Sequence, residues 1–144
     1  MDGIGFEDLA VGMTASTGKT ITEADILMFA AVSTDTNPVH LNAEAAAASP
    51  FGARIAHGML SAGLISAVLG TRLPGPGTIY LSQSLRFRAP VKIGDTVTAT
   101  VEVTGLDPAR KRAMLKTVCT VGGKVVIDGE AVVLPPATPG VVEV

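Results

Sequence analysis

The longest apolar segment of the chain, residues 55–70, places the strongest constraint on its fold. Three polar side chains interrupt it: His57, Ser61 and Ser66. A helix over 58–69 would present hydrophobic residues around its whole circumference, which is typical of a helix buried inside a protein. A bilayer span needs about 20 mostly apolar residues, so this segment is too short to cross a membrane. We therefore predict a buried helix against which the rest of the chain packs.

The proline- and glycine-rich segment 73–77 marks a change from helical to strand patterns. Beyond it, the apolar residues from Val97 to Val103 alternate with threonine and glutamate, which is the period of two of a half-buried strand. We predict strands over 78–87, 96–106, 113–121 and 124–134, with one more around 13–20. No helical pattern separates the last strands, so the sheet should be antiparallel. The predicted fold is α+β, with an antiparallel sheet of about five strands wrapped around the buried helix.

Two shorter helices are predicted before the apolar segment. Thr22 and Asp25 have the spacing of a capping box at the start of a helix over 22–32. Asn42 has a side chain suited to cap a second helix over 43–48.

Length and composition limit the class of protein. The 144 residues suit one domain, which we place at 1–134, and three prolines predict a flexible C-terminal tail over 135–144. A formal net charge of −2 argues against nucleic acid as a partner. The N-terminus has no signal-peptide pattern, and no membrane partner is predicted. The single cysteine, Cys119, excludes an internal disulfide and favours a cytoplasmic location; its mid-strand position predicts a buried, unreactive thiol.

The chemistry of the chain is concentrated in one short segment. Asp35, Asn37 and His40 lie within six residues, and the second of the two histidines, His57, follows seventeen residues later. Proline cannot continue a helix from the preceding turn, so Pro38 predicts that this segment is an ordered loop. A carboxylate beside a neutral imidazole is the usual means of moving protons near neutral pH. By itself the pair justifies only a generic acid/base hypothesis.

The surrounding motifs resemble those of a known family. The segments that carry the resemblance are Asp35-Thr36-Asn37-Pro38-Val39-His40, His57-Gly58-Met59-Leu60, Leu73-Pro74-Gly75, residues 80–87, Pro90-Val91 and Gly94-Asp95. They are similar to the hydratase 2 motif and its flanks in the MaoC-like, (R)-specific enoyl-CoA hydratases. The similarity covers most of the chain and is greatest to the short, single-domain bacterial forms that supply (R)-3-hydroxyacyl-CoA for polyhydroxyalkanoate synthesis.

The resemblance implies a fold, a reaction and a set of residues. It implies a hot-dog fold in a homodimer whose sheets join edge to edge, and reversible syn addition of water to trans-2-enoyl-CoA. It implies that Asp35 and His40 are the catalytic pair and that the backbone N–H of Gly58 faces the thioester oxygen. Ser66 matches a family serine near the active site. Asn37 is expected to fix the loop through side-chain to backbone hydrogen bonds.

Further expectations concern the substrate and the loop geometry. Arg88 and Lys92 are the candidates for binding coenzyme A phosphates, and coenzyme A enters as part of the acyl-CoA substrate, so no cofactor is expected. No metal is expected, because the histidine and carboxylate spacings lack a metal-ligand pattern. His57 is expected to be a structural histidine bonded to backbone. Many family members have glycine where this chain has Thr34; because β-branched residues disfavour positive φ, we expect ordinary backbone geometry at Thr34.

Three alternatives to the hydratase remain at this stage. A dehydratase of the same fold could act on 3-hydroxyacyl carrier protein or on a branched or carboxylated acyl-CoA with the same catalytic pair. A hot-dog thioesterase would direct water to the thioester carbonyl, which the Asp-x-Asn-Pro-x-His arrangement disfavours. A non-catalytic acyl-CoA binding module would have no use for both Asp35 and His40.

Overall fold

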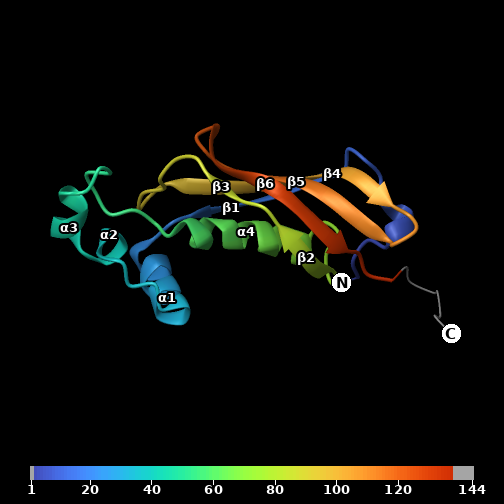
Figure 1. Ribbon diagram of the computed structural model, residues 1–144, viewed down its shortest axis with the longest axis horizontal. Helices are drawn as coiled ribbons and strands as arrows, with labels where there is room; N and C mark the ends of the chain where they lie inside the picture. The colour runs from blue at the N-terminus through green and yellow to red at the C-terminus, as the bar shows by residue number, and fades with distance from the viewer. Residues whose placement is uncertain (1, 138–144) are drawn as a thin grey trace.

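A six-stranded antiparallel sheet forms the larger layer of the molecule (Figure 1). The computed structural model describes residues 2–137. The strands are β1 (Thr14–Thr20), β2 (Ile79–Gln83), β3 (Arg86–Phe87), β4 (Thr96–Asp107), β5 (Arg112–Val121) and β6 (Lys124–Leu134). Their order is β1-β4-β5-β6-β2, with β3 also paired to β6, so β1 and β2 lie at the two ends of this order. The predicted α+β class and antiparallel sheet are confirmed.

The sixth strand arises because the predicted strand 78–87 is divided in two. The pairing of β2 with β6 shifts register between Tyr80 and Ser82, and the chain then leaves the ladder before β3 begins. At the break, the Ser84 N–H donates to Glu130 O (2.9 Å) and Ser84 Oγ accepts from Glu130 N–H (3.0 Å). Gly129 permits Ser84 to approach β6 this closely, because a Cβ at position 129 would overlap the Ser84 carbonyl oxygen.

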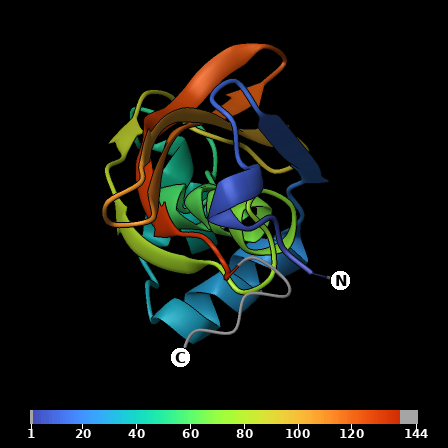
Figure 2. The ribbon, with the colours of Figure 1, turned by 90° about the vertical axis from the view of Figure 1, so that its right-hand side faces the viewer.

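The predicted central helix is α4 (Gly58–Thr71), and the sheet wraps around it (Figure 2). Ile65, Val68 and Leu69 point into the core and are at most 1% exposed. The expectation that the helix is buried on all sides is wrong for the single chain. Because the sheet covers only part of the helix circumference, Met59 on another face is 55% exposed. Within residues 2–137, no helix combines the length and apolarity needed to cross a bilayer.

Short helices precede α4 and form a separate group at one end of the molecule (Figure 1). They are α1 (Glu23–Ser33), α2 (Pro38–Leu41) and α3 (Ala43–Ala47), and a 3₁₀ turn η1 (Phe6–Asp8) lies before them. The capping box of α1 is present: Asp25 N–H donates to Thr22 Oγ1 (3.2 Å) and Thr22 N–H donates to Asp25 Oδ2 (2.9 Å). The latter bond, from the Thr22 backbone, lowers the pKa of Asp25. Asn42 caps α3 as predicted, accepting from Ala45 N–H at 3.0 Å.

Two local expectations around the acid–imidazole segment are wrong. The segment is not a loop throughout, because Pro38 is the first residue of α2 and His40 lies on that helical turn. Proline lacks only an N–H that a first helical residue would leave unpaired, so it starts this helix instead of preventing it. Thr34 adopts the left-handed conformation, with φ 63° and ψ 11°, at the C-terminal end of α1. Tertiary contacts on Asp35, described below, override the local preference of a β-branched residue.

Of the predicted C-terminal tail, residues 138–144 lie outside the described residues.

Candidate active site

The Asp35 carboxylate is held by the start of α2. Asp35 Oδ1 accepts from Asn37 N–H (3.2 Å), and Asn37 Oδ1 in turn accepts from Val39 N–H (3.1 Å) and caps the helix. The Asp35 N–H donates to Ser33 Oγ at 3.1 Å. Asp35 is exposed, while its backbone is tied on both sides. The carboxylate is therefore fixed in direction yet open to a water molecule or ligand.

The imidazole of His40 is fixed in one orientation. His40 is only 8% exposed, and its Nδ1 lies 2.8 Å from Ile55 O. A carbonyl oxygen only accepts, so Nδ1 carries a hydrogen, and proton exchange with a ligand is confined to Nε2. The backbone is held as well, because Arg54 Nε donates to His40 O (2.7 Å) while its guanidinium pairs with Glu23 at 2.7 and 2.9 Å.

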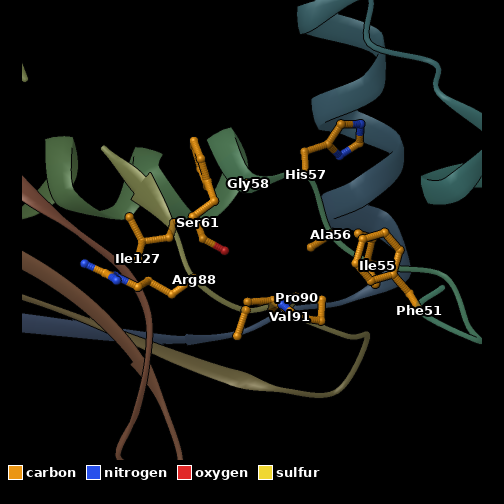
Figure 3. A pocket seen from close by; sticks show the side chains of 12 residues that line it. Phe51, Ile55, Ala56, His57, Gly58, Ser61, Arg88, Pro90, Val91 and Ile127 are labelled. Carbon is orange, nitrogen blue, oxygen red and sulfur yellow. The ribbon is translucent and has the colours of Figure 1, made fainter. Parts of the chain in front are cut away.

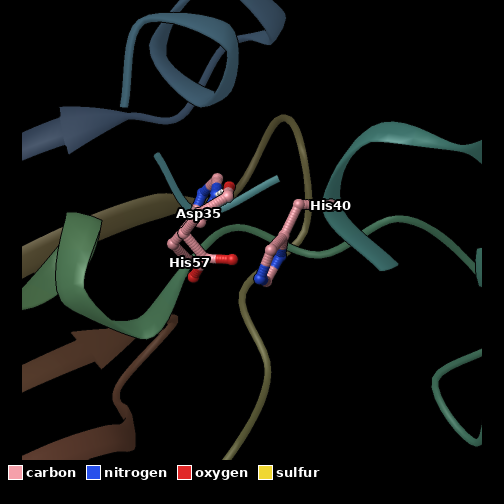
Figure 4. A group of neighbouring side chains, drawn as sticks. All are labelled: Asp35, His40 and His57. Atoms are coloured by element: carbon pink, nitrogen blue, oxygen red, sulfur yellow. Dashed lines mark hydrogen bonds between the residues drawn. The ribbon is translucent and has the colours of Figure 1, made fainter. Parts of the chain in front are cut away.

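The second histidine lies against this pair (Figure 4). His57 is 2% exposed, and its Nε2–H donates to the backbone oxygen of Asp35 (2.9 Å). Its ring stacks on His40, with centroids 3.9 Å apart and planes inclined by 29°. One side-chain oxygen of Asp35 and one ring nitrogen from each of His40 and His57 lie within 4.8 Å of one another. The sequence predicted the bond from His57 to backbone but not the stack.

The same three residues form a cluster that could be considered for a metal ion. Imidazole binds a metal through a lone pair in the plane of its ring. The rings of His40 and His57 are stacked face to face, so their in-plane lone pairs do not converge on one point. His40 Nδ1 and His57 Nε2 are also engaged with backbone oxygens. The geometry suits proton transfer better than metal coordination.

A cavity of about 280 Å³ opens at the start of α4 (Figure 3). Gly58 and Ser61 of the helix line it together with Phe87, Val91 and Ile127. A Cβ on Gly58 would lie 2.5 Å from the Phe87 ring, so glycine is needed for this close packing. The side chain of the preceding residue makes no capping bond, and the N–H groups at this helix end carry a positive partial charge. The first turn of α4 is thus a suitable donor for a developing oxyanion.

Ser61 was not selected from the sequence. Its hydroxyl is buried, faces the same cavity as Gly58 and has no hydrogen-bond partner within residues 2–137. Its position three residues after Gly58 places both on one face of the helix, which is a signal that spacing alone could have given.

The other predicted residues lie farther from this centre. Ser66 is exposed and lines a second cavity of about 420 Å³ with Met59 and Tyr80. The stem of Arg88 lines the Gly58 cavity, but its Nε donates to Asp128 Oδ2 (2.8 Å) and the guanidinium points away (Figure 3). Lys92 is exposed. The structure therefore joins Asp35, His40 and Gly58 through His57, and does not bring Ser66 or Lys92 into the same cluster.

Cys119 is buried, as its mid-strand position predicted. Burial raises the pKa of the Cys119 thiol to about 11, so the reactive thiolate is disfavoured. Its Sγ contacts Ser61 O at 3.6 Å. Cys119 therefore belongs to the core beneath the site.

Comparison with known proteins identifies the family. Residues 9–128 match the model of the MaoC like domain. An (R)-specific enoyl-CoA hydratase of Rhodospirillum rubrum is 64% identical over 92% of each chain. A 3-hydroxybutyryl-CoA dehydratase of Methylorubrum extorquens is 58% identical, covering 91% of this chain and 83% of that one. The unliganded R-hydratase of Pseudomonas aeruginosa superposes with a TM-score of 0.89 at 46% identity, covering 99% of this chain and 94% of that one.

These matches agree with the sheet-wrapped helix. The chain belongs to the MaoC-like family and has its hot-dog fold.

Proposed function

We propose that the protein is an (R)-specific enoyl-CoA hydratase, a hydro-lyase that adds water reversibly to trans-2-enoyl-CoA to give (R)-3-hydroxyacyl-CoA. The observation that carries the proposal is the placement of the Asp35 carboxylate beside His40, whose Nδ1 is occupied by Ile55 O. The identity of 64% to the Rhodospirillum rubrum hydratase supports the same reaction.

The two residues divide the proton transfers. Asp35 accepts a proton from water, and the oxygen forms a bond to the β-carbon. Asp35 passes this proton to His40 Nε2, and His40 delivers it to the α-carbon, so both groups end as they began. Because one water lies between two neighbouring groups, hydroxyl and proton are added to the same face, which gives syn addition. General acid–base catalysis of this kind contributes about 10²- to 10⁴-fold in rate.

Gly58 stabilises the charge that forms during addition. As water attacks the β-carbon, negative charge collects on the thioester oxygen. The N–H of Gly58 at the start of α4 donates to that oxygen, and the helix dipole adds to the hydrogen bond. The donor is fixed by the fold before the substrate arrives, so little reorganisation accompanies the reaction.

Residues outside the Asp35–His40–Gly58 cluster are assigned to the coenzyme A and acyl parts of the substrate. Arg88 and Lys92 bind the phosphates of coenzyme A, and Ser66 supports the acyl group in the second cavity. Coenzyme A is part of the substrate, and no other cofactor is required. The exposed face of α4 and the neighbouring strand β2 pair with a second copy of the chain in a homodimer, which would cover Met59 and Leu81. The setting is cytoplasmic.

The reverse reaction is the second candidate for the physiological direction. It is favoured by the identity of 58% to a 3-hydroxybutyryl-CoA dehydratase. The same residues serve both directions, because the microscopic steps are the same.

The test is a hydration assay with crotonyl-CoA. The conjugated enoyl absorbance should disappear without release of free thiol, and the product should be (R)-3-hydroxybutyryl-CoA. Release of thiol without hydration would refute the proposal and favour a thioesterase. Binding without any turnover would favour a non-catalytic acyl-CoA module.

A further inference from the structure

His57 is linked to three parts of the site at once. Its Nε2–H donates to Asp35 O (2.9 Å), and its ring stacks on His40 with centroids 3.9 Å apart. It is also the residue immediately before Gly58, at the N-terminal cap of α4. The ring of Phe29 also lies near it, with centroids 4.8 Å apart and planes inclined by 51°. No other residue within 2–137 contacts both members of the proposed catalytic pair in these ways.

The contacts do not make His57 a proton donor or acceptor for the substrate. Its Nε2 hydrogen is used by Asp35 O, and its Nδ1 is buried without a hydrogen-bond partner within the described residues. Although His57 is among the residues that line the cavity beside Gly58, its two ring nitrogens are thus occupied or enclosed by the protein. Neither nitrogen is therefore directed at a bound acyl group.

We infer that His57 is a positioning residue, which aligns Asp35 and His40 on the same water molecule. The donated hydrogen bond fixes the Asp35 backbone just after the strained Thr34, and the stack fixes the rotation of the His40 ring about its bond to Ile55 O. This role rests on the proposed hydration. A displacement of about 1 Å at reacting groups can reduce the rate by about 100-fold, so small losses of alignment are measurable.

The two contacts can be removed separately. His57→Gln keeps an N–H donor of similar reach but loses the aromatic ring. His57→Phe keeps an aromatic ring against His40 but has no donor for Asp35 O. Each variant should lower kcat for crotonyl-CoA by about 10-fold or more, with KM changed by less than about twofold, because His57 does not touch the substrate.

Coupling to His40 separates positioning from a merely structural role. When His57→Gln, which removes the ring stacked on His40, is added to His40→Gln, the further loss in kcat should be less than about twofold, since the group that the ring aligns is already absent. Val103→Ala is the matched control. Val103 is fully buried in β4 outside the site, so its truncation should lower the unfolding temperature and leave kcat unchanged well below that temperature.

A second readout does not depend on activity. The chain has two histidines, so their ring signals can be followed by NMR. In His57→Gln the ring current of the stacked imidazole is lost, and the His40 ring protons should move downfield, whereas in His57→Phe they should stay shielded. Unchanged His40 signals in His57→Gln would overturn the inference, as would near-normal kcat in both variants or losses that multiply with His40→Gln. An inactive wild-type protein would instead refute the proposed hydration, and the NMR result would still decide the stack.

Discussion

Thr34 stores backbone strain directly before Asp35, and replacing it with glycine should release that strain. Thr34 has φ 63° and lies at the end of α1, where its side chain is exposed and makes no hydrogen bond within residues 2–137. An L-residue in the left-handed conformation costs roughly 1–2 kcal/mol. Glycine removes this cost but adds roughly 0.5–1 kcal/mol of conformational entropy to the unfolded chain. Thr34→Gly should therefore raise the free energy of unfolding by about 0.5–1 kcal/mol.

The assay is urea unfolding at one fixed protein concentration, because the proposed dimer would make apparent stability depend on concentration. Thr36→Gly is the matched control, since Thr36 is exposed in the same segment and has no positive φ. Both variants carry the same entropy cost, so the difference between them measures the strain, about 1–2 kcal/mol. Equal stabilities of the two variants would refute the reasoning. Glycine can adopt the same conformation, so Thr34→Gly should keep kcat within about twofold of wild type.

Three further outcomes follow from the described contacts. Asp35→Asn and His40→Gln should each reduce kcat on crotonyl-CoA by about 100-fold or more while circular dichroism shows an intact fold; near-normal rates would refute the site. Because the pKa of Cys119 is raised, the folded state holds the thiol proton more tightly than the unfolded state does. The free energy of unfolding should therefore fall by about 2 kcal/mol as the pH rises from 9.0 to about 11, as measured by urea unfolding across that range. Cys119→Ala should flatten that dependence. Thr22→Ala should lose about 1 kcal/mol in urea unfolding, because it removes the cap of α1, and an unchanged midpoint would contradict this account of the capping box.

Features determined by neighbouring residues in the sequence were predictable. The alternation of β4 predicted a strand over 96–106, and the structure has Thr96–Asp107. The capping box predicted the start of α1 within one residue. In both cases the signal is a side-chain period or a cap that acts within a few residues, and no distant contact alters it.

Features determined by distant contacts were not predictable. The division of the predicted strand 78–87 into β2 and β3 depends on Gly129, because only a residue without a side chain lets Ser84 approach β6 so closely. The open face of α4 depends on how far the sheet extends around the helix, which the apolar composition of residues 58–69 does not encode. A uniformly apolar helix is also expected where one face meets a second chain instead of its own sheet, as in the proposed homodimer.

Thr34 and His57 illustrate why the site itself was only partly predictable. The family motif indicates which residues act, but their alignment depends on contacts between residues 22 positions apart, such as His57 Nε2–H to Asp35 O. That bond and the one from Asp35 N–H to Ser33 Oγ hold the aspartate backbone from both sides, so Thr34 between α1 and Asp35 must take the remaining conformation, even at positive φ. Local preference therefore fails at Thr34, where the end of α1 on one side and the tertiary bond from His57 to Asp35 on the other leave little conformational choice. The same contacts that impose the strain hold Asp35 beside His40, which makes the strained residue a consequence of the site's rigidity.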